Sequence, residues 1–120
     1  MKQEKNWGIT RKVYQGPVNE LYHLSIKEGG FCSEHRHNKY NLFYVLSGLL
    51  EISIWRNEDG EEKLIDVTKL GPEEVTAVPP GFWHKFRALE KTECIELYYT
   101  ILQTEDIERR TKGGVEEWAK

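Results

Sequence analysis

Hydrophobic and polar residues alternate with a period of two along most of the chain. A period of two predicts β-strands with one buried face, because successive side chains of a strand point to opposite sides. β-Branched and aromatic residues, which suit pleated sheets, are frequent in these runs. The apolar positions of the three clearest runs are Tyr22, Leu24 and Ile26; Leu50, Ile52 and Ile54; and Ile95, Leu97, Tyr99 and Ile101.

Turn-forming dipeptides separate the predicted strands. Asp59-Gly60 stands between the second alternating run and the segment Lys63–Val67, and this arrangement predicts a β-hairpin. Short strands separated by turns every eight to twelve residues predict an all-β sandwich or barrel. The other turn dipeptides are Gly16-Pro17, Gly29-Gly30, Ser47-Gly48, Gly71-Pro72 and Pro80-Gly81.

The length of the chain, 120 residues, predicts a single domain. We expect one domain over residues 1–120, with a barrel core from about 20 to 102 and a polar tail over 103–120. No helical period appears before about residue 103, and the segment Val115–Trp118 could form a short turn of helix.

Charge and composition exclude several classes of function. The formal net charge of −3 argues against a nucleic-acid partner, since such proteins normally carry a basic excess. The longest apolar run, Leu42–Leu46, is too short to span a membrane, and no signal peptide is evident, so we expect a cytoplasmic protein. Cys32 and Cys94 lie far apart and form no CxxC motif, which favours two buried thiols over a disulfide framework.

The histidines are the most informative residues. His35 and His37 flank one arginine, and on a strand such a pair would point to the same side and could share a metal ion. About forty residues later, the turn Pro79-Pro80-Gly81 precedes His84 at the expected start of a strand. We expect His23, on a polar strand face, to lie at the surface or to support another residue.

The spacing of these residues resembles the two sequence motifs of the cupin family. In this chain the first motif is represented by Gly29, His35, His37, Asn41 and Gly48, and the second by Pro79, Gly81 and His84. Three positions depart from the family pattern. Asn41 replaces a glutamate, Glu73 a glycine and Ala88 an asparagine.

The resemblance implies a fold and a metal site. The fold would be a single cupin double-stranded β-helix, or jelly-roll barrel, with a short C-terminal tail, and cupins commonly form homodimers. The ligands would be His35, His37, Asn41 and His84, and the metal a divalent ion such as zinc, manganese, iron or nickel. Because an amide oxygen is a weaker ligand than a carboxylate, three alternatives stay open. Asn41 ligates weakly, a water or substrate oxygen replaces it, or the site has lost its metal.

Strand alternation suggests which side chains surround the site. Asn41 and Phe43 would share the inward face of one strand, and His84 and Phe86 that of another. The outward face of the first strand would then be apolar and need a cover, which a homodimer would provide. Lys39, Phe43 and Phe86 are the candidate substrate-binding residues. Glu96, Tyr98 and Tyr99 are candidate general acids or bases, although the sequence leaves open which of them point inward.

Taken together, the residues and the resemblance predict a metal-dependent enzyme that acts on a small polar substrate. The pattern is loosely similar to that of small cupins of the mannose-6-phosphate isomerase type, which would imply an isomerase or epimerase of a sugar or sugar phosphate. Two alternatives remain. One is an Fe(II) dioxygenase-type cupin, and the other is a non-catalytic module that binds or senses a small ligand.

Overall fold

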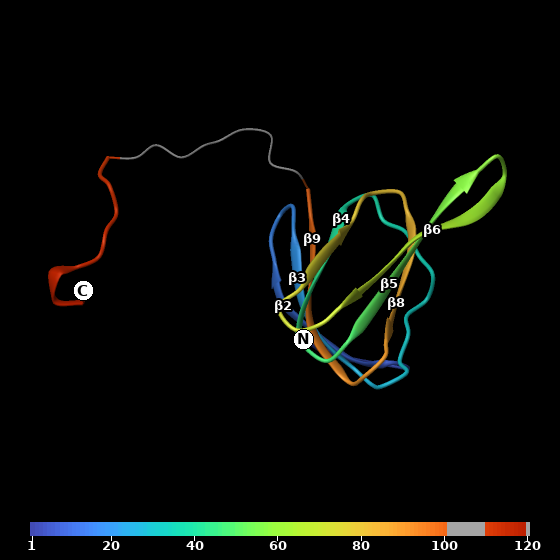
Figure 1. The fold of residues 1–120 in the computed structure, drawn as a ribbon, viewed down its shortest axis with the longest axis horizontal. Helices are drawn as coiled ribbons and strands as arrows, with labels where there is room; N and C mark the ends of the chain where they lie inside the picture. The colour runs from blue at the N-terminus through green and yellow to red at the C-terminus, as the bar shows by residue number, and fades with distance from the viewer. Residues whose placement is uncertain (101–109, 120) are drawn as a thin grey trace.

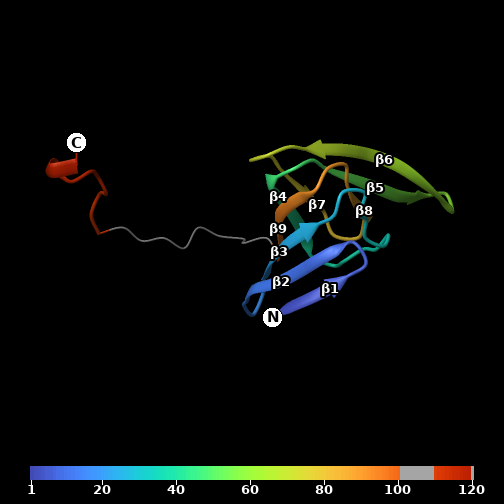
Figure 2. The ribbon, with the colours of Figure 1, turned by 90° about the horizontal axis from the view of Figure 1, so that it is seen from below.

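Two antiparallel β-sheets pack face to face in a computed structural model that describes residues 1–100 and 110–119 (Figures 1 and 2). The larger sheet has the strand order β1-β2-β3-β9-β4-β7, and the smaller sheet has the order β6-β5-β8. The prediction of an all-β jelly-roll domain is confirmed.

The described elements are nine strands and one short 3₁₀ helix in the tail. The helix overlaps the turn of helix expected at the end of the chain, whereas the start of the predicted tail and Ile101 lie outside the described residues. The elements are β1 (Lys2–Lys5), β2 (Gly8–Gln15), β3 (Glu20–Ile26), β4 (Tyr40–Ser47), β5 (Leu50–Glu58), β6 (Glu61–Leu70), β7 (Val75–Val78), β8 (Trp83–Ala88), β9 (Thr92–Tyr99) and η1 (Glu117–Ala119).

The hydrophobic core fills the space between the inward faces of the two sheets. Alternate residues of β4 and β5 are buried, which agrees with the predicted period of two. On β9 the structure shows which of the two alternating sets of side chains points into the core. Cys94 and Glu96 are buried, whereas Ile95 and Leu97 are only half-buried on the opposite face. The acidic and aromatic candidates of this strand are therefore divided between the two faces.

The hairpin predicted at Asp59-Gly60 is present. Glu58 pairs with Glu61 across the turn, and the φ angles of Asp59 and Gly60 are +52° and +80°. Two positive φ angles define a type I′ turn, whose twist matches that of the flanking strands. The β5–β6 hairpin extends beyond the body of the two sheets (Figure 1).

Gly48, one of the motif glycines, is required by the turn between β4 and β5. Its φ is +96°, and a Cβ atom at this position would lie 2.3 Å from the carbonyl oxygen of Lys91. No other residue fits such a close backbone approach. Gly48 therefore has a structural role in closing this end of the barrel.

The expectation that His35 and His37 lie on a strand is wrong. The segment between β3 and β4 runs along the free edge of β8, and His35 forms only an isolated bridge with His84. The segment advances three residues for every two residues of β8, so a regular ladder cannot form. The hydrogen bonds join the N–H groups of Gly29, Cys32 and His35 to the carbonyl groups of Ala88, Phe86 and His84, respectively.

The sheet begins earlier than the core boundary expected near residue 20. β1 and β2 pair with each other, and β2 continues the larger sheet through β3. Between them, Trp7 packs edge-on against Phe86, with ring centroids 5.0 Å apart. The sequence does not reveal β1, because all four of its residues are polar and exposed.

The outward face of β4 is apolar, as the alternation predicted. Leu42 and Tyr44 are half-buried, and Leu46 and the neighbouring Val75 of β7 are 45% and 53% exposed. The expected homodimer stays a prediction. Among the described residues, no helix is both long and apolar enough to cross a membrane.

Candidate metal centre

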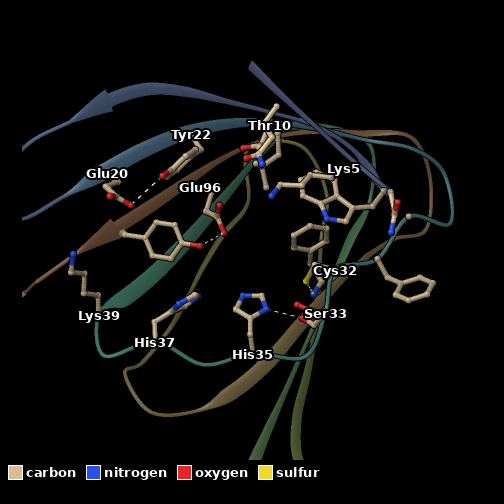
Figure 3. A pocket seen from close by; sticks show the side chains of 18 of the residues that line it. Lys5, Thr10, Glu20, Tyr22, Cys32, Ser33, His35, His37, Lys39 and Glu96 are labelled. Atoms are coloured by element: carbon tan, nitrogen blue, oxygen red, sulfur yellow. Dashed lines mark hydrogen bonds between the residues drawn. The ribbon is translucent and has the colours of Figure 1, made fainter. Parts of the chain in front are cut away.

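Three histidine side chains converge at one end of the barrel. Their potential ligand atoms all lie within 4.8 Å of one another, although His35 and His37 come from the loop before β4 and His84 comes from β8. The ring centroids of His35 and His84 are 4.4 Å apart, and those of His35 and His37 are 4.7 Å apart. Figure 3 shows His35 and His37 side by side, with their rings directed into a cavity.

Backbone hydrogen bonds bring these residues together. His35 and His84 exchange both of their N–H···O bonds, with lengths of 3.1 and 2.8 Å. The N–H of Gly81, in the proline-glycine turn, donates to the carbonyl oxygen of His37 at 2.8 Å. Both motifs of the sequence are thus tied to each other by the main chain, independently of any ion.

Backbone carbonyl groups orient two of the three histidine rings. Nδ1 of His35 lies 2.7 Å from the carbonyl oxygen of Ser33, and Nδ1 of His84 lies 3.0 Å from that of Phe82. A carbonyl oxygen only accepts, so these two contacts favour the tautomer with the proton on Nδ1 and the lone pair on Nε2. In the other tautomer of His84, Nε2 donates to Oδ1 of Asn41 at 3.1 Å. Nε2 of His37 is buried and has no hydrogen-bond partner within the described part of the chain. Such a donor set fits a divalent transition metal.

Burial keeps two of the rings in the neutral form that a metal requires. The pKa of His84 is lowered to about 4, mainly by burial and to a smaller extent by the two neighbouring histidines, while the hydrogen bond to Phe82 acts in the opposite direction. Burial also lowers the pKa of His37, and the nearby His35 adds to this effect. At neutral pH both side chains are therefore uncharged.

Asn41 lies beside the histidines, where the cupin motif has glutamate. Its side chain is fully buried, and its Oδ1 is 3.1 Å from Nε2 of His84. Neighbouring ligands of an ion with bonds of about 2.1 Å at right angles are about 3.0 Å apart. The amide oxygen of Asn41 is therefore close enough to serve as a fourth ligand.

A buried carboxylate lies behind Asn41. Oε2 of Glu96 accepts hydrogen bonds from Nδ2 of Asn41 at 3.3 Å and from the hydroxyl of Tyr98 at 3.2 Å. Burial raises the pKa of Glu96 to about 7, although these two hydrogen bonds lower it. The Tyr98 ring also contacts His37, with centroids 4.9 Å apart. The polar network thus runs from the histidines into β9.

A cavity of about 1010 Å³ opens beside the histidines. Besides His35 and His37, four of the candidate residues from the sequence line it, namely Lys39, Phe86, Glu96 and Tyr98. Lys39 has no ion pair with any residue that the structure describes. The wall therefore combines a cation, a carboxylate and an apolar surface.

Two candidates lie elsewhere. Phe43 is fully buried in the core, where it packs against Phe86 with ring centroids 6.1 Å apart, and it does not line the cavity. Tyr99 points to the opposite face of β9 and stacks on Tyr40 at 5.3 Å. Strand alternation separates it from Glu96 and Tyr98. His23 is also remote from the site and pairs with Glu93 at 3.2 Å.

Sequence reasoning missed the part of the cavity wall that the first three strands form. Lys5, Trp7, Thr10, Glu20 and Tyr22 line this side, where the hydroxyl of Tyr22 donates to Glu20 at 3.2 Å (Figure 3). Tyr22 belongs to an alternating run, and that was the one available signal. The strands β1 and β2 carry no pattern that would place their residues at a cavity.

Comparison with known proteins agrees with the geometry. The family model of the cupin domain (Cupin_2) matches residues 22–98, which is more than half of the chain. This chain is a cupin. The matched region contains the three histidines, Asn41 and Glu96, so that the whole of the candidate centre lies within the cupin domain.

Several solved structures share the fold of this cupin. A conserved protein of unknown function from Streptococcus pyogenes is 18% identical over 83% of this chain and 80% of its own, with a TM-score of 0.67. KdgF from Halomonas sp. is 20% identical over 85% and 87% of the two chains, with a TM-score of 0.66. Oxalate decarboxylase from Bacillus subtilis, described with Mn(II) centres, is 19% identical over 83% of this chain, with a TM-score of 0.71.

These likenesses show the fold alone, because the identities are low. This cupin spans 27% of the oxalate decarboxylase chain. A search of functionally curated proteins found no match.

Proposed function

We propose that this cupin binds a divalent metal ion and is a metal-dependent isomerase of a small polar substrate, such as a sugar or sugar phosphate. The observation that carries the proposal is the set of converging histidine nitrogens, one of which is buried without a partner among the described residues. His35, His37 and His84 would hold the ion, with Asn41 as a weaker oxygen ligand. When bound, the ion would supply Lewis acidity that polarises a carbonyl or hydroxyl group.

Glu96 is the group of the cavity wall best suited to move a proton. Its Oε2 holds the hydrogen bonds from Asn41 and Tyr98, whereas its Oε1 has no hydrogen-bond partner among the described residues. In an aldose–ketose isomerisation, this carboxylate would take the proton from C2 and return it to C1. The C2 hydroxyl proton would pass to the former carbonyl oxygen, so that atoms and electrons balance.

The rest of the wall supports a polar substrate with an anionic group. Lys39, on one side of the cavity, and Lys5, on β1, are cations without an ion pair among the described residues. A carboxylate or phosphate could be bound by either of them. Trp7 and Phe86 add an apolar surface against which the C–H face of a sugar ring could pack.

An Fe(II) dioxygenase-type activity is the second candidate. The neutral amide of Asn41 favours it, because three histidines and a weak ligand leave positions at which a substrate and oxygen could both bind. A relative in fold, the Bacillus subtilis oxalate decarboxylase, is described with Mn(II) centres, which is compatible with a redox-active metal. A non-catalytic module that binds a small ligand is the third alternative.

Metal analysis of the purified protein, followed by activity assays, distinguishes these functions. We expect about one equivalent of zinc, manganese or nickel and interconversion of aldose and ketose sugars without oxygen uptake. Bound iron together with oxygen uptake would show that the function is that of a dioxygenase and not that of an isomerase. A protein that binds none of these metals, even when they are added to the chelator-treated sample, would overturn the metal site and leave the binding module.

A further inference from the structure

The candidate metal centre has no negatively charged side chain among the described residues in direct contact with the histidine nitrogens. Its potential ligands are three neutral imidazoles and the amide of Asn41. A divalent ion would bring two positive charges into a buried place, which is costly without a countercharge. The structure supplies a carboxylate one hydrogen bond further away, on Glu96, whose side chain is 8% exposed.

The geometry of this hydrogen bond also decides how the Asn41 amide is oriented. An amide has one end that donates and one that accepts. Alone, Asn41 could turn its Nδ2 towards Nε2 of His84 and donate a hydrogen bond, which would occupy the lone pair that an ion needs. Oε2 of Glu96 lies 3.3 Å from Nδ2, so this donor is held away from His84 and Oδ1 faces Nε2 at 3.1 Å.

Glu96 is itself held in place. Its Oε2 accepts a second hydrogen bond, from the hydroxyl of Tyr98 at 3.2 Å. Tyr98 packs edge-on against Tyr22, with ring centroids 5.9 Å apart, and against His37. Two donors converge on one carboxylate oxygen, which is the arrangement that an acceptor with negative charge favours.

We propose that Glu96 is a positioning residue of the metal centre. It turns the oxygen of Asn41 towards the ion and supplies the negative charge that the cupin motif normally places on a directly bound glutamate. Asn41 thus supplies the oxygen ligand and Glu96 the negative charge, whereas the glutamate of the cupin motif would supply both. This inference rests on the proposed metal site, and it adds to the proton-transfer role of Oε1 without depending on it.

The test moves the charge from Glu96 to position 41. Chelator-treated protein is titrated with Co²⁺ in a calorimeter, and the visible spectrum of the bound Co²⁺ is recorded. In Glu96→Gln the affinity for Co²⁺ should fall about 10- to 100-fold, as is typical when a residue that supports a ligand is changed. In Asn41→Asp/Glu96→Gln the affinity should return to within about threefold of the original, because a carboxylate now contacts the ion directly.

A matched control and a second readout separate positioning from general damage. Glu93→Gln changes a carboxylate of the same strand that points to the outer face, where it accepts from Ser25, and it should leave the Co²⁺ affinity unchanged. Isomerase activity should stay lost in the double variant although the metal affinity is restored, since the amide that replaces the Glu96 carboxylate accepts no proton. Restored metal affinity without restored activity would not follow if Glu96 had only a structural role.

Different results would overturn the inference and the metal site. If Glu96→Gln bound Co²⁺ as tightly as the unchanged protein, or if the double variant bound no better than Glu96→Gln, Glu96 would not support the ion. If Glu96→Gln did not fold, the Co²⁺ affinity of the single variant Asn41→Asp would test the inference. Because the carboxylate of Glu96 already supplies the negative charge, this affinity should rise at most about threefold, and a larger rise would contradict the inference. If the unchanged protein bound no Co²⁺, the proposed metal site itself would fail.

Discussion

Nε2 of His84 and Oδ1 of Asn41 lie 3.1 Å apart in the closed interior of the barrel. Nδ1 of the same ring lies 3.0 Å from the carbonyl oxygen of Phe82, so both nitrogens of His84 face acceptor oxygens although the neutral ring has only one proton to donate. With that proton on Nδ1, the lone pair of Nε2 faces the amide oxygen of Asn41, an arrangement that a cation bound by both atoms would stabilise. With the proton on Nε2, the two side chains are joined by a hydrogen bond instead.

Removal of single histidines should abolish metal binding. We expect His35→Ala and His84→Ala each to retain less than about a tenth of the bound metal, because a ligand that is lost from a four-ligand set is not replaced. Metal content is measured by mass spectrometry of the purified protein after incubation with Zn²⁺, and folding by circular dichroism.

His23→Ala is the matched control, since His23 pairs with Glu93 on the outer face of the sheet and should leave the metal content unchanged. A folded His35→Ala or His84→Ala protein with full metal content would show that the ligand assignment is incorrect.

Cys32 should react unusually slowly with alkylating reagents. It is 7% exposed, its Sγ accepts a hydrogen bond from the N–H of Phe86, and burial raises the pKa of its thiol to about 11. The thiolate is the reactive form, so at pH 8 the rate with iodoacetamide should be roughly 100-fold below that of a free thiol. The rate should rise about tenfold per pH unit and level off only near the pKa.

Intact-mass spectrometry follows the alkylation of Cys32 over this pH range. Cys94 is completely buried, burial raises the pKa of its thiol still further, and it should remain unmodified until the protein is unfolded in guanidinium chloride. A rate for Cys32 that levelled off at pH 9 or below would contradict this prediction.

Glu73→Gly should stabilise the protein. Glu73 has a φ angle of +68°, a conformation that costs a residue with a Cβ atom about 1–2 kcal/mol and costs glycine nothing. Glycine loses part of this gain through the greater freedom of the unfolded chain. We expect a net increase of about 0.5–1 kcal/mol in the free energy of unfolding, measured by urea denaturation.

The neighbouring Glu74→Gly serves as the control for Glu73→Gly. Glu74 has no positive φ angle, and its Oε1 accepts a hydrogen bond from the N–H of Gly71, so this change should destabilise the turn. Equal effects of the two changes would show that backbone strain at Glu73 is not relieved.

The homodimer predicted from the apolar face of β4 can be tested by charge insertion. Leu46 is 45% exposed, and Val75, 53% exposed, is paired with Tyr44 on the same face. If a second copy covers this face, Leu46→Glu/Val75→Glu should shift the protein from dimer to monomer in sedimentation velocity, because two buried charges would lack partners.

Val13→Glu on β2, where Val13 is 58% exposed, should leave the sedimentation coefficient unchanged. A monomer before any substitution, at concentrations up to the millimolar range, would contradict the predicted dimer.

The strand pattern and the motifs could be read from the sequence because they depend on local rules. A period of two identifies the buried faces of β4 and β5, and the dipeptide Asp59-Gly60 specifies a type I′ turn through its backbone preferences. The same rules failed at His35 and His37, since a bulged loop along β8 has no periodic signature.

The sequence by itself therefore determined most of the strands, the turns and the residues capable of binding a metal. Only the tertiary structure decided that Glu96 and Tyr98 face the cavity while Tyr99 does not, and that Glu96 accepts a hydrogen bond from Asn41. The physical reason is that alternation places residues in two sets without saying which set is inside. That choice follows from the pairing of β9 with β3 and β4, strands far away in the chain.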